Sequence, residues 1–446
     1  MSGTDRTAGT WGISRRRFVG AIAAGVAAFR GLRVGAAGPY RVARMATNDG
    51  YTGTLSGLAA SGEFPNVSGR TVVIKPNLVS KRLPETGVTT DSQVVRAIVD
   101  HALGAGAAAV KIIEGGTRGA GFNECGYGFF TTYHPRVALV DLGGEPLSYV
   151  TVPPATPPSG TGGVPAAYQT LILPSTVLAP DVVFVSAAKM KTHAESTATL
   201  ALKNLYGVPP STPYVDPSGQ SYLPRFKLHE RSLGQTIASL ALARPIDFAV
   251  VDGVVGLEGN GPVDLIGGTP IDANVIVAGK NALAVDLACI DLMGIARADV
   301  QHLEYAYLSG LGPADMSQIE LVGDPVTVPE FMLPPVLPAK VWCPRITPAQ
   351  FSVAGGRCTV GYKLLQDAQV QVQVLRTSDR PPSQSIVRTL QPWTEIAAGN
   401  YSLQWDGRDD SGQPIVPTLY GIRVQTRHGP ADTVIGAGIN WVTVTA

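Results

Sequence analysis

Charged residues, aromatic residues and cysteines are all scarce in this sequence of 446 residues. Only 15% of its residues are charged, and 35 basic residues are balanced by 34 acidic ones. Because no excess of positive charge is available to meet a phosphate backbone, this balance argues against a nucleic-acid-binding protein. Hydrophobic residues make up 45% of the chain, which excludes a disordered protein and predicts a large core.

The cysteines are too few and too far apart for a metal motif. Cys125, Cys289, Cys343 and Cys358 contain no Cys-x-x-Cys pair, which excludes an iron–sulfur or zinc-ribbon motif by spacing. Cys289 falls in an apolar helical pattern and is expected to be a small buried hydrophobe. Outside the cytoplasm, Cys343 and Cys358 could form a disulfide across a short loop.

The first residues of the chain resemble an export signal. Residues 14–19, SRRRFV, are similar to a twin-arginine motif, and the apolar residues 19–29 follow. That run is too short for a membrane-spanning helix, which needs about 20 residues. We therefore expect residues 1–37 to be a signal peptide, with an uncleaved anchor as the alternative. The resemblance implies passage through the twin-arginine export machinery to the periplasm or the extracellular space.

Apolar runs and amphipathic segments alternate between residues 38 and 325, which predicts an α/β domain. The continuous apolar strands favour a mostly parallel sheet with helices on both faces. Ser or Thr followed three residues later by Gln predicts capping boxes at Thr90 and Ser232. Strands are expected at residues 71–76, 109–113, 137–142, 182–185, 246–251, 275–278 and 319–322, and helices after both caps and at residues 281–293 and 300–308.

Basic residues gather in residues 189–207, KMKTHAESTATLALKNLYG, directly after the apolar run at 182–185. Ligands bind at the carboxyl edge of open α/β sheets, where these residues are expected to lie. One interpretation is a solvated basic loop. The other is an anion or acid/base site, because converging ammonium groups bind anions and lower one another's pKa. In the second case the catalytic candidates are His193, Lys191 and Lys203, and the ligand-binding candidates are Lys189 and Asn204.

Other polar residues follow the ends of neighbouring strands. Lys75 and Asn77 fall at the carboxyl end of the first of these and are further ligand-binding candidates. Three carboxylates, Glu114, Asp252 and Asp286, are the candidates for a metal or a metal-bearing cofactor. Asp286 falls inside an apolar helix, where an unpaired carboxylate costs several kcal/mol, so a partner such as a site lysine is expected.

A glycine-rich segment, VGLEGNGPV at residues 255–263, follows the strand predicted to end at residue 251. Its glycines permit positive φ angles and a close approach of backbone N–H groups to a ligand. It lacks the Gly-Lys-Ser/Thr ending of a Walker loop and the placement of a dinucleotide fingerprint, so neither ATP nor NAD is predicted. Asn260 is the ligand-binding candidate here.

Four of these motifs occur in the order typical of one family. Lys-Pro-Asn, Lys-x-Lys-x-His, Leu-Lys-Asn-Leu-x-Gly and Gly-x-Gly-Pro together resemble the domain-of-unknown-function 362 family, from about Val72 to Gly323. The resemblance implies an α/β fold, a candidate site at these motifs and a family aspartate at Asp286. Some relatives carry an iron–sulfur module, whose cysteine pattern is absent here. The family has no settled chemistry to carry over.

The last part of the chain differs in composition. Residues 326–348 are rich in proline and predict a linker, and residues 349–446 show short alternating strands. Residues 405–412, WDGRDDSG, resemble the turn of the Ig-like domain in flagellar hook-capping proteins. That resemblance implies a small all-β Ig-like sandwich that contacts a protein partner.

Two functional hypotheses follow from these patterns. In the first, an exported protein binds a small anionic ligand or a metal-bearing cofactor through its Lys/His/Asn site, with acid/base catalysis by His193 or a lysine. In the second, it is a non-catalytic binding or surface-assembly protein that docks through the Ig-like domain. Residue chemistry carries both hypotheses, since fold alone does not define function.

Overall fold

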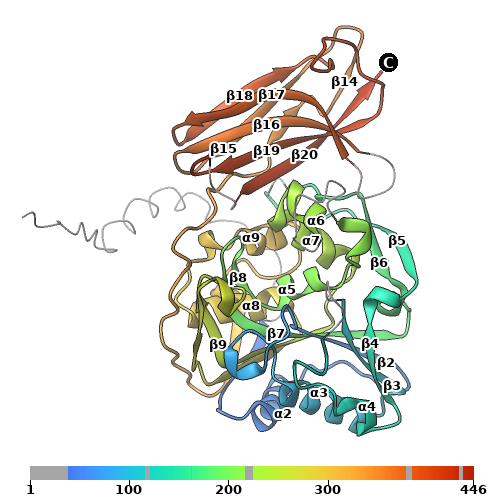
Figure 1. The fold of residues 1–446 in the computed structure, drawn as a ribbon, viewed down its shortest axis with the longest axis vertical. Coiled ribbons are helices and arrows are strands. Elements are labelled where there is room, and N and C mark those ends of the chain that lie inside the picture. The colour runs from blue at the N-terminus through green and yellow to red at the C-terminus, as the bar shows by residue number, and fades with distance from the viewer. Residues whose placement is uncertain (1–38, 116–120, 162, 216–224, 378–383, 431–434) are drawn as a thin grey trace, which may run out of the picture. The chain divides into compact units, whose positions relative to one another are not determined.

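A ten-stranded mixed sheet organises the first part of the described chain (Figure 1). The computed structural model describes residues 39–446 apart from 116–120, 162, 216–224, 378–383 and 431–434. The predicted signal peptide at residues 1–37 therefore lies outside the described residues. Tyr40–Ala446 form one compact unit. No helix in the described ranges is long and apolar enough to cross a membrane.

The strand order of this sheet is β12-β1-β11-β9-β7-β2-β3-β4. Strands β4, β3, β2, β7 and β9 are parallel, whereas β11 is antiparallel to both β9 and β1. The prediction of a mostly parallel α/β sheet is confirmed for this core. The strands are β1 (Tyr40–Ala46), β2 (Thr71–Pro76), β3 (Ala109–Glu114), β4 (Val137–Asp141), β7 (Val182–His193), β8 (Thr197–Thr199), β9 (Phe248–Gly259), β10 (Gly268–Ile271), β11 (Val275–Gly279) and β12 (Ile319–Gly323).

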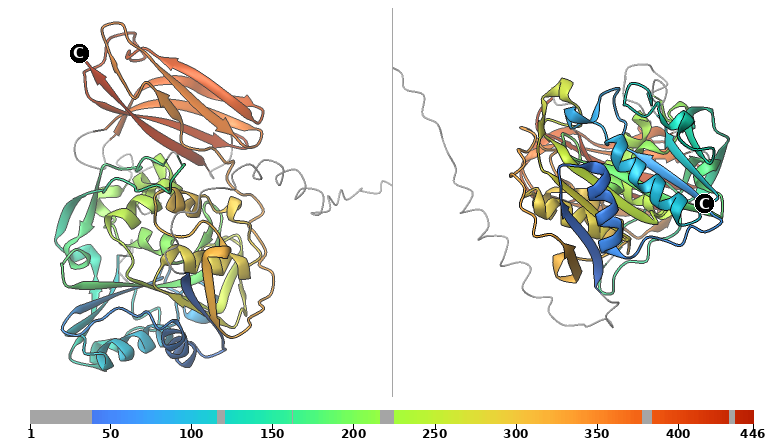
Figure 2. Two further views of the ribbon diagram at one scale, coloured as in Figure 1. Left: turned by 180° about the vertical axis from the view of Figure 1, so that it is seen from behind. Right: turned by 90° about the horizontal axis from the view of Figure 1, so that it is seen from below.

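Helices cover both faces of the sheet, as predicted (Figures 1 and 2). Alternate residues of the strands enter two separate cores, so Val72 and Ile74 pack toward α2 and α3 while Val73 enters the core that contains α7, α8 and α9. The helices are α2 (Gly50–Ser61), α3 (Ser92–Gly104), α4 (Phe130–Tyr133), α5 (Ala201–Asn204), α6 (Phe226–Arg231), α7 (Leu233–Ala243), α8 (Ala282–Leu292) and α9 (Gln301–Leu308).

One of the two predicted helix caps is correct and the other is displaced by one residue. The Ser232 hydroxyl accepts the N–H of Gln235 at the start of α7, as predicted. At the start of α3, however, the cap is Asp91, whose carboxylate accepts the N–H of Gln93. The prediction of Thr90 as the cap is wrong, because its hydroxyl forms hydrogen bonds with the sheet and not with the helix. It accepts the N–H of Asn77 and donates to the carbonyl of a residue in β7.

Strands β7 and β9 are twelve residues long and extend eight residues beyond their predicted ends, to His193 and Gly259. Lysines and glycines in these extensions were interpreted as loop residues. In the structure β8 pairs with the end of β7, and β10 pairs with the end of β9. Strands β7 and β9 therefore continue beyond the level at which β2 ends, at Pro76. The candidate residues of β7 therefore lie on a buried strand and not on a loop.

A two-stranded hairpin of β5 (Leu147–Thr151) and β6 (Thr170–Pro174) precedes β7. After β12, residues 324–344 contain no helix or strand apart from an isolated bridge at Val341, so this part of the predicted linker is irregular. Its last residues belong to β13, which begins at Arg345.

Residues 345–446 contain only β-strands among their described residues. One sheet has the order β13-β15-β18 and the other has the order β14-β20-β19-β16-β17, which confirms a C-terminal all-β part. Both contribute to one core around Trp405. All four cysteines are free, so Cys343 and Cys358 form no disulfide here. The strands are β13 (Arg345–Thr347), β14 (Gln350–Ser352), β15 (Cys358–Leu364), β16 (Ala368–Thr377), β17 (Gln384–Ile396), β18 (Gly399–Trp405), β19 (Leu419–Arg427) and β20 (Gly436–Thr445).

Candidate functional site

Two buried ion pairs join neighbouring strands: one links the carboxyl ends of β2 and β3, and the other links the interior of β7 to that of β9. Lys75 Nζ lies 2.7 Å from Glu114 Oε2, and Lys189 Nζ lies 2.8 Å from Asp252 Oδ2. The Lys189 side chain is only 1% exposed, so the interpretation of a solvated basic loop is wrong. Burial lowers the pKa of Lys75, and the charge of Glu114 opposes that shift. These pairs position the strand ends on which the remaining site residues lie.

The two carboxylates of these pairs are also bound by backbone N–H groups. Glu114 accepts the N–H groups of Leu78 and Gly115, at 3.1 and 2.8 Å. Asp252 accepts the N–H groups of Asp91 and Val254, at 2.8 and 3.1 Å. Each carboxylate thus uses both of its oxygens inside the protein.

Asp286, the third metal candidate, caps the start of α5. Its two oxygens accept the N–H groups of Ala201 and Leu202, at 2.8 and 3.0 Å. Burial raises the pKa of Asp286 to about 7, and the two backbone hydrogen bonds oppose that shift. The prediction of a lysine partner is wrong, because the short helix that carries Lys203 supplies the partners through its backbone. Across the described ranges, no three His, Cys, Asp or Glu side chains come together as metal ligands.

Lys191 is held by three neutral acceptors. Its Nζ donates to Asn77 Oδ1 at 2.6 Å, to the carbonyl of Val88 at 2.9 Å and to the carbonyl of Pro262 at 3.4 Å. Burial lowers the pKa of Lys191 well below its usual value, and the charges of Lys203 and Lys189 add to the effect. Since all three N–H directions are used, Lys191 joins three distant segments and has no donor left for a ligand.

The two asparagines belong to the same network. Asn77 Nδ2 donates to Asn204 Oδ1 at 3.1 Å, and Asn204 Nδ2 donates to the carbonyl of Lys75 at 2.8 Å. Both amides are buried and hold the ends of β2 and β7 against α5. Their place in the structure is next to Lys191, as the sequence predicted, but their polar atoms face protein groups.

The glycine-rich segment belongs to the sheet up to Gly259, where β9 ends, and only residues 260–263 lie beyond the strand. Asn260 Nδ2 donates to the carbonyl of Ile266 within its own turn, so the structure does not bring Asn260 to the lysine network. A Cβ atom on Gly261 would lie 2.1 Å from the carbonyl oxygen of Thr192. Glycine is therefore required here for contact with β7. The backbone of this segment was expected to approach a ligand closely. In the structure it approaches strand β7 instead.

Lys203 differs from the other lysines of the site because its amine is not bound by the hydrogen-bond network described above. It lies on α5, is 9% exposed and has no hydrogen bond or ion pair to another described residue. Its Nζ lies 5.7 Å from the centre of the Tyr206 ring. Burial lowers the pKa of Lys203 to about 8, and the charge of Glu195 opposes the shift. This amine can therefore exchange a proton near neutral pH.

His193 lies beside Lys203 and is neutral. Burial lowers the pKa of His193 well below its usual value, and among nearby charges that of Lys203 contributes most. Its Nδ1 accepts the N–H of Glu195 at 3.0 Å and that of Ser196 at 3.4 Å. The imidazole is thus fixed by the turn that connects β7 to β8.

Two further residues of the site were not among the sequence candidates. The carboxylate of Glu195 lies 2.7 Å from Nδ1 of His229, which comes from α6. The ring of His229 also meets Tyr206 edge-on at 5.0 Å between ring centres. Glu195 lies only two positions from His193, but no local pattern points to His229, because its place is set by the packing of α6.

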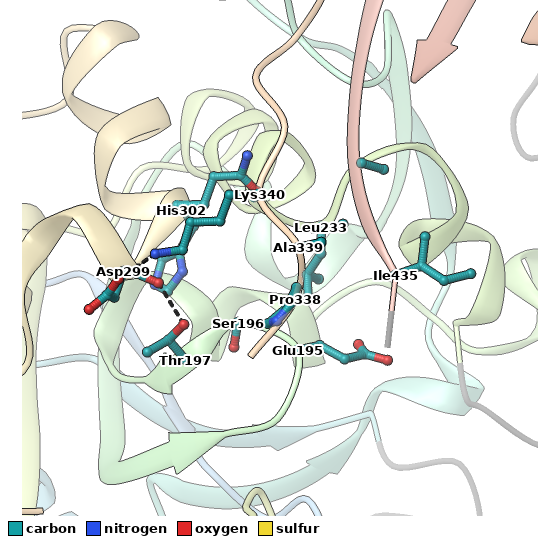
Figure 3. Close-up of a pocket in the computed structure, with 14 residues that line it drawn as sticks. Glu195, Ser196, Thr197, Leu233, Asp299, His302, Pro338, Ala339, Lys340 and Ile435 are labelled. Carbon is teal, nitrogen blue, oxygen red and sulfur yellow. Dashed lines mark hydrogen bonds and ion pairs between the residues drawn. The ribbon is translucent and has the colours of Figure 1, made fainter. Parts of the chain in front are cut away.

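Glu195 also lines a small pocket, whose lining does not include Lys203, His193 or His229 (Figure 3). Its volume is ≈ 30 Å³, which is room for about two water-sized groups. Glu195 and His302 both line the pocket, and the charge of Lys203 contributes to lowering the pKa of each. Burial is the main cause of the shift of the His302 pKa, to about 3. In the described structure the buried Nε2 of His302 has no hydrogen-bond partner.

We expect the amine of Lys203 to titrate at about pH 8, because burial disfavours its charged form. The measurement is competitive labelling with trace acetic anhydride over a pH series, with peptide mapping by mass spectrometry. An unperturbed lysine titrates near pH ~10.4. A midpoint above 9.5 for Lys203 would contradict the expected burial of an unpaired amine.

Part of the chain is similar to a known protein family. Residues 72–291 match the family described as Domain of unknown function (DUF362). The thylakoid-associated protein sll1697 of Synechocystis sp. is 25% identical over 296 residues, which cover 63% of this chain and 82% of the relative. The resemblance predicted from the four motifs is confirmed over this narrower range.

Two solved structures resemble small parts of the chain. FlgD from P. aeruginosa is 22% identical and covers 20% of this chain and 61% of its own, with a TM-score of 0.16. The soluble domain of PmoD from Methylocystis sp. is 12% identical and covers 22% of this chain and 78% of its own, with a TM-score of 0.15. Scores this low carry no argument about the fold or the function of the C-terminal part.

Proposed function

We propose, starting from the DUF362 domain that the chain carries, that this protein binds a small anionic ligand beside Lys203. The carrying observation is that the Lys203 side chain, in a residue only 9% exposed, has no hydrogen-bonded carboxylate, unlike Lys75 and Lys189. A buried ammonium that lacks a partner is strongly unfavourable. An anion that accepts its hydrogen bonds would remove that penalty.

The chemistry around Lys203 suits acid/base catalysis on such a ligand. An amine with a pKa of about 8 is close to the range in which general bases work best. His193, held neutral by burial, offers its second ring nitrogen to a ligand without repelling Lys203. Lys191, Asn77 and Asn204 would act as positioning residues, because they join the segments that carry the site.

The remaining parts of the proposal concern location and contacts. The twin-arginine motif at residues 14–19 supports export to the periplasm or the extracellular space. The all-β part, with the WDGRDDSG turn at residues 405–412, supports an Ig-like module for a protein partner. A non-catalytic binding or surface-assembly protein remains the second candidate, since this module could dock it without any reaction.

Replacing Lys203 by methionine tests the anion site. We expect isothermal titration calorimetry with sodium phosphate and with sodium acetate to show binding of at least one of them to the wild type. Lys203→Met should weaken that binding at least about tenfold, because a charge-assisted hydrogen bond contributes about 1.5–3 kcal/mol. Lys81→Met removes an exposed lysine paired with Glu124 and should bind as the wild type does.

Equal affinity in Lys203→Met and the wild type would contradict the proposed site. Elemental analysis of the purified protein, with the same variants, would detect a metal-bearing cofactor held in place of a simple anion. Turnover of a bound molecule that is lost in His193→Gln while binding persists would identify an enzyme. Binding without any turnover would favour the second candidate.

A further inference from the structure

Glu195 contacts two imidazole rings in two different ways. Its backbone N–H donates to Nδ1 of His193 at 3.0 Å, and its carboxylate lies 2.7 Å from Nδ1 of His229. The two rings come from β7 and α6, which are far apart in the sequence. They lie close enough for the charge of His229 to contribute to the lowered pKa of His193.

These contacts fix opposite tautomers. A neutral imidazole carries its proton on one nitrogen and a lone pair on the other. Since Nδ1 of His193 accepts a hydrogen bond, its proton lies on Nε2. Since Nδ1 of His229 faces a carboxylate, that nitrogen donates, and in the neutral form of the ring the lone pair lies on Nε2. In the neutral rings, Nε2 of His193 is therefore a donor and Nε2 of His229 an acceptor.

The turn that carries Glu195 is held in an unusual backbone conformation. Thr197 has a φ of 66°, which is rare for a β-branched residue, and its hydroxyl donates to the carbonyl of Asp299 at 2.6 Å. Strain of this kind persists only where surrounding contacts enforce it, and it is concentrated at functional sites. The hydrogen bond of Thr197 to Asp299 thus anchors the first residue of β8, directly after the turn that carries Glu195.

We propose that His193 and His229 form an acid/base pair around the ligand, with Glu195 as the residue that positions both. This inference rests on the anion site proposed at Lys203. The ligand class it selects is a small anion that also carries a hydroxyl group. The hydroxyl proton moves to Nε2 of His229, and the electron pair of the broken O–H bond remains on the ligand oxygen. That oxygen accepts a hydrogen bond from Nε2–H of His193, while the carboxylate of Glu195 stabilises the imidazolium form of His229.

The tautomers can be measured directly by NMR spectroscopy. The chain has six histidines, so long-range ¹H–¹⁵N spectra of ¹⁵N-histidine-labelled protein are simple to assign with His193→Gln and His229→Gln. In the wild type at neutral pH we expect the proton of His229 on Nδ1 and that of His193 on Nε2. In Glu195→Ala the proton of His229 should move to Nε2. His193 should not change, because alanine keeps the backbone N–H that fixes it.

Glu195→Asp keeps a carboxylate and should retain part of the Nδ1–H form of His229. A wild-type spectrum with the His229 proton on Nε2 would overturn the proposal, even if no variant folds. A simultaneous change of both histidines in Glu195→Ala, with an unchanged circular dichroism spectrum, would also overturn it. Phosphate and acetate titrations of the same samples report on Lys203 separately, so loss of the anion site and loss of the paired tautomers are distinguishable.

Discussion

Asp252→Ala is expected to lower the free energy of unfolding by about 3–5 kcal/mol, since it leaves the Lys189 ammonium uncompensated inside the protein. Both partners of this ion pair are almost fully buried. The substitution also removes the acceptor of the Asp91 N–H, at the residue that caps α3. The loss of stability is measured by urea unfolding monitored by circular dichroism.

Two control variants separate charge from other effects. Asp252→Asn keeps the shape and the acceptor for the backbone but removes the charge, so its loss should be smaller than that of Asp252→Ala. Asp264→Ala breaks an ion pair with Arg82 that is about one-third exposed, and such pairs contribute about 0–1 kcal/mol. Equal losses in Asp252→Ala and Asp264→Ala would show that the buried pair is not important for stability.

Asp286→Ala should both destabilise the protein and abolish anion binding. It would leave two buried N–H groups at the start of α5 without an acceptor, and each such group costs about 1–3 kcal/mol. Because α5 also carries Lys203, disorder at its first turn would displace the proposed ligand contact. Thermal unfolding and calorimetric titration with phosphate measure the two effects.

Asp286→Asn provides the matched comparison. With a pKa of about 7 the carboxyl group exchanges its proton near neutral pH, and asparagine resembles the neutral form in size and in its carbonyl acceptor. Only one of the two N–H groups keeps its acceptor, so we expect roughly half of the loss seen with alanine. Wild-type stability in Asp286→Ala would mean that the start of α5 does not depend on this cap.

The sequence was sufficient to locate most strands and helices of the α/β part, because apolar runs and helical periodicity dominate there. It placed the ends of β7 and β9 eight residues too early. A lysine normally indicates a solvated position. The sequence pattern does not reveal that Asp252, on the neighbouring strand β9, forms an ion pair with Lys189 and allows it to be buried. Helix α2 was missed because its glycines and short side chains give no amphipathic pattern.

The structure brings several of the candidate residues together but gives each of them different partners. The motif order correctly grouped Lys75, Asn77, Lys191 and Asn204 at one edge of the sheet. Which lysine is saturated by acceptors and which is not depends on carbonyl groups of remote loops, and these are invisible in the pattern of side chains. The same reason hides His229, whose partnership with Glu195 exists only in three dimensions.

The position of β1 has a consequence for synthesis on the ribosome. Tyr40–Ala46 pairs with Val275–Gly279 on one side and with Ile319–Gly323 on the other. At about 5–20 residues per second, roughly 15–55 s pass between the synthesis of this first strand and that of its last partner. During that interval its backbone N–H and C=O groups are an unpaired edge, which is prone to associate with other chains. The nascent chain therefore needs this segment shielded until translation has passed residue 323.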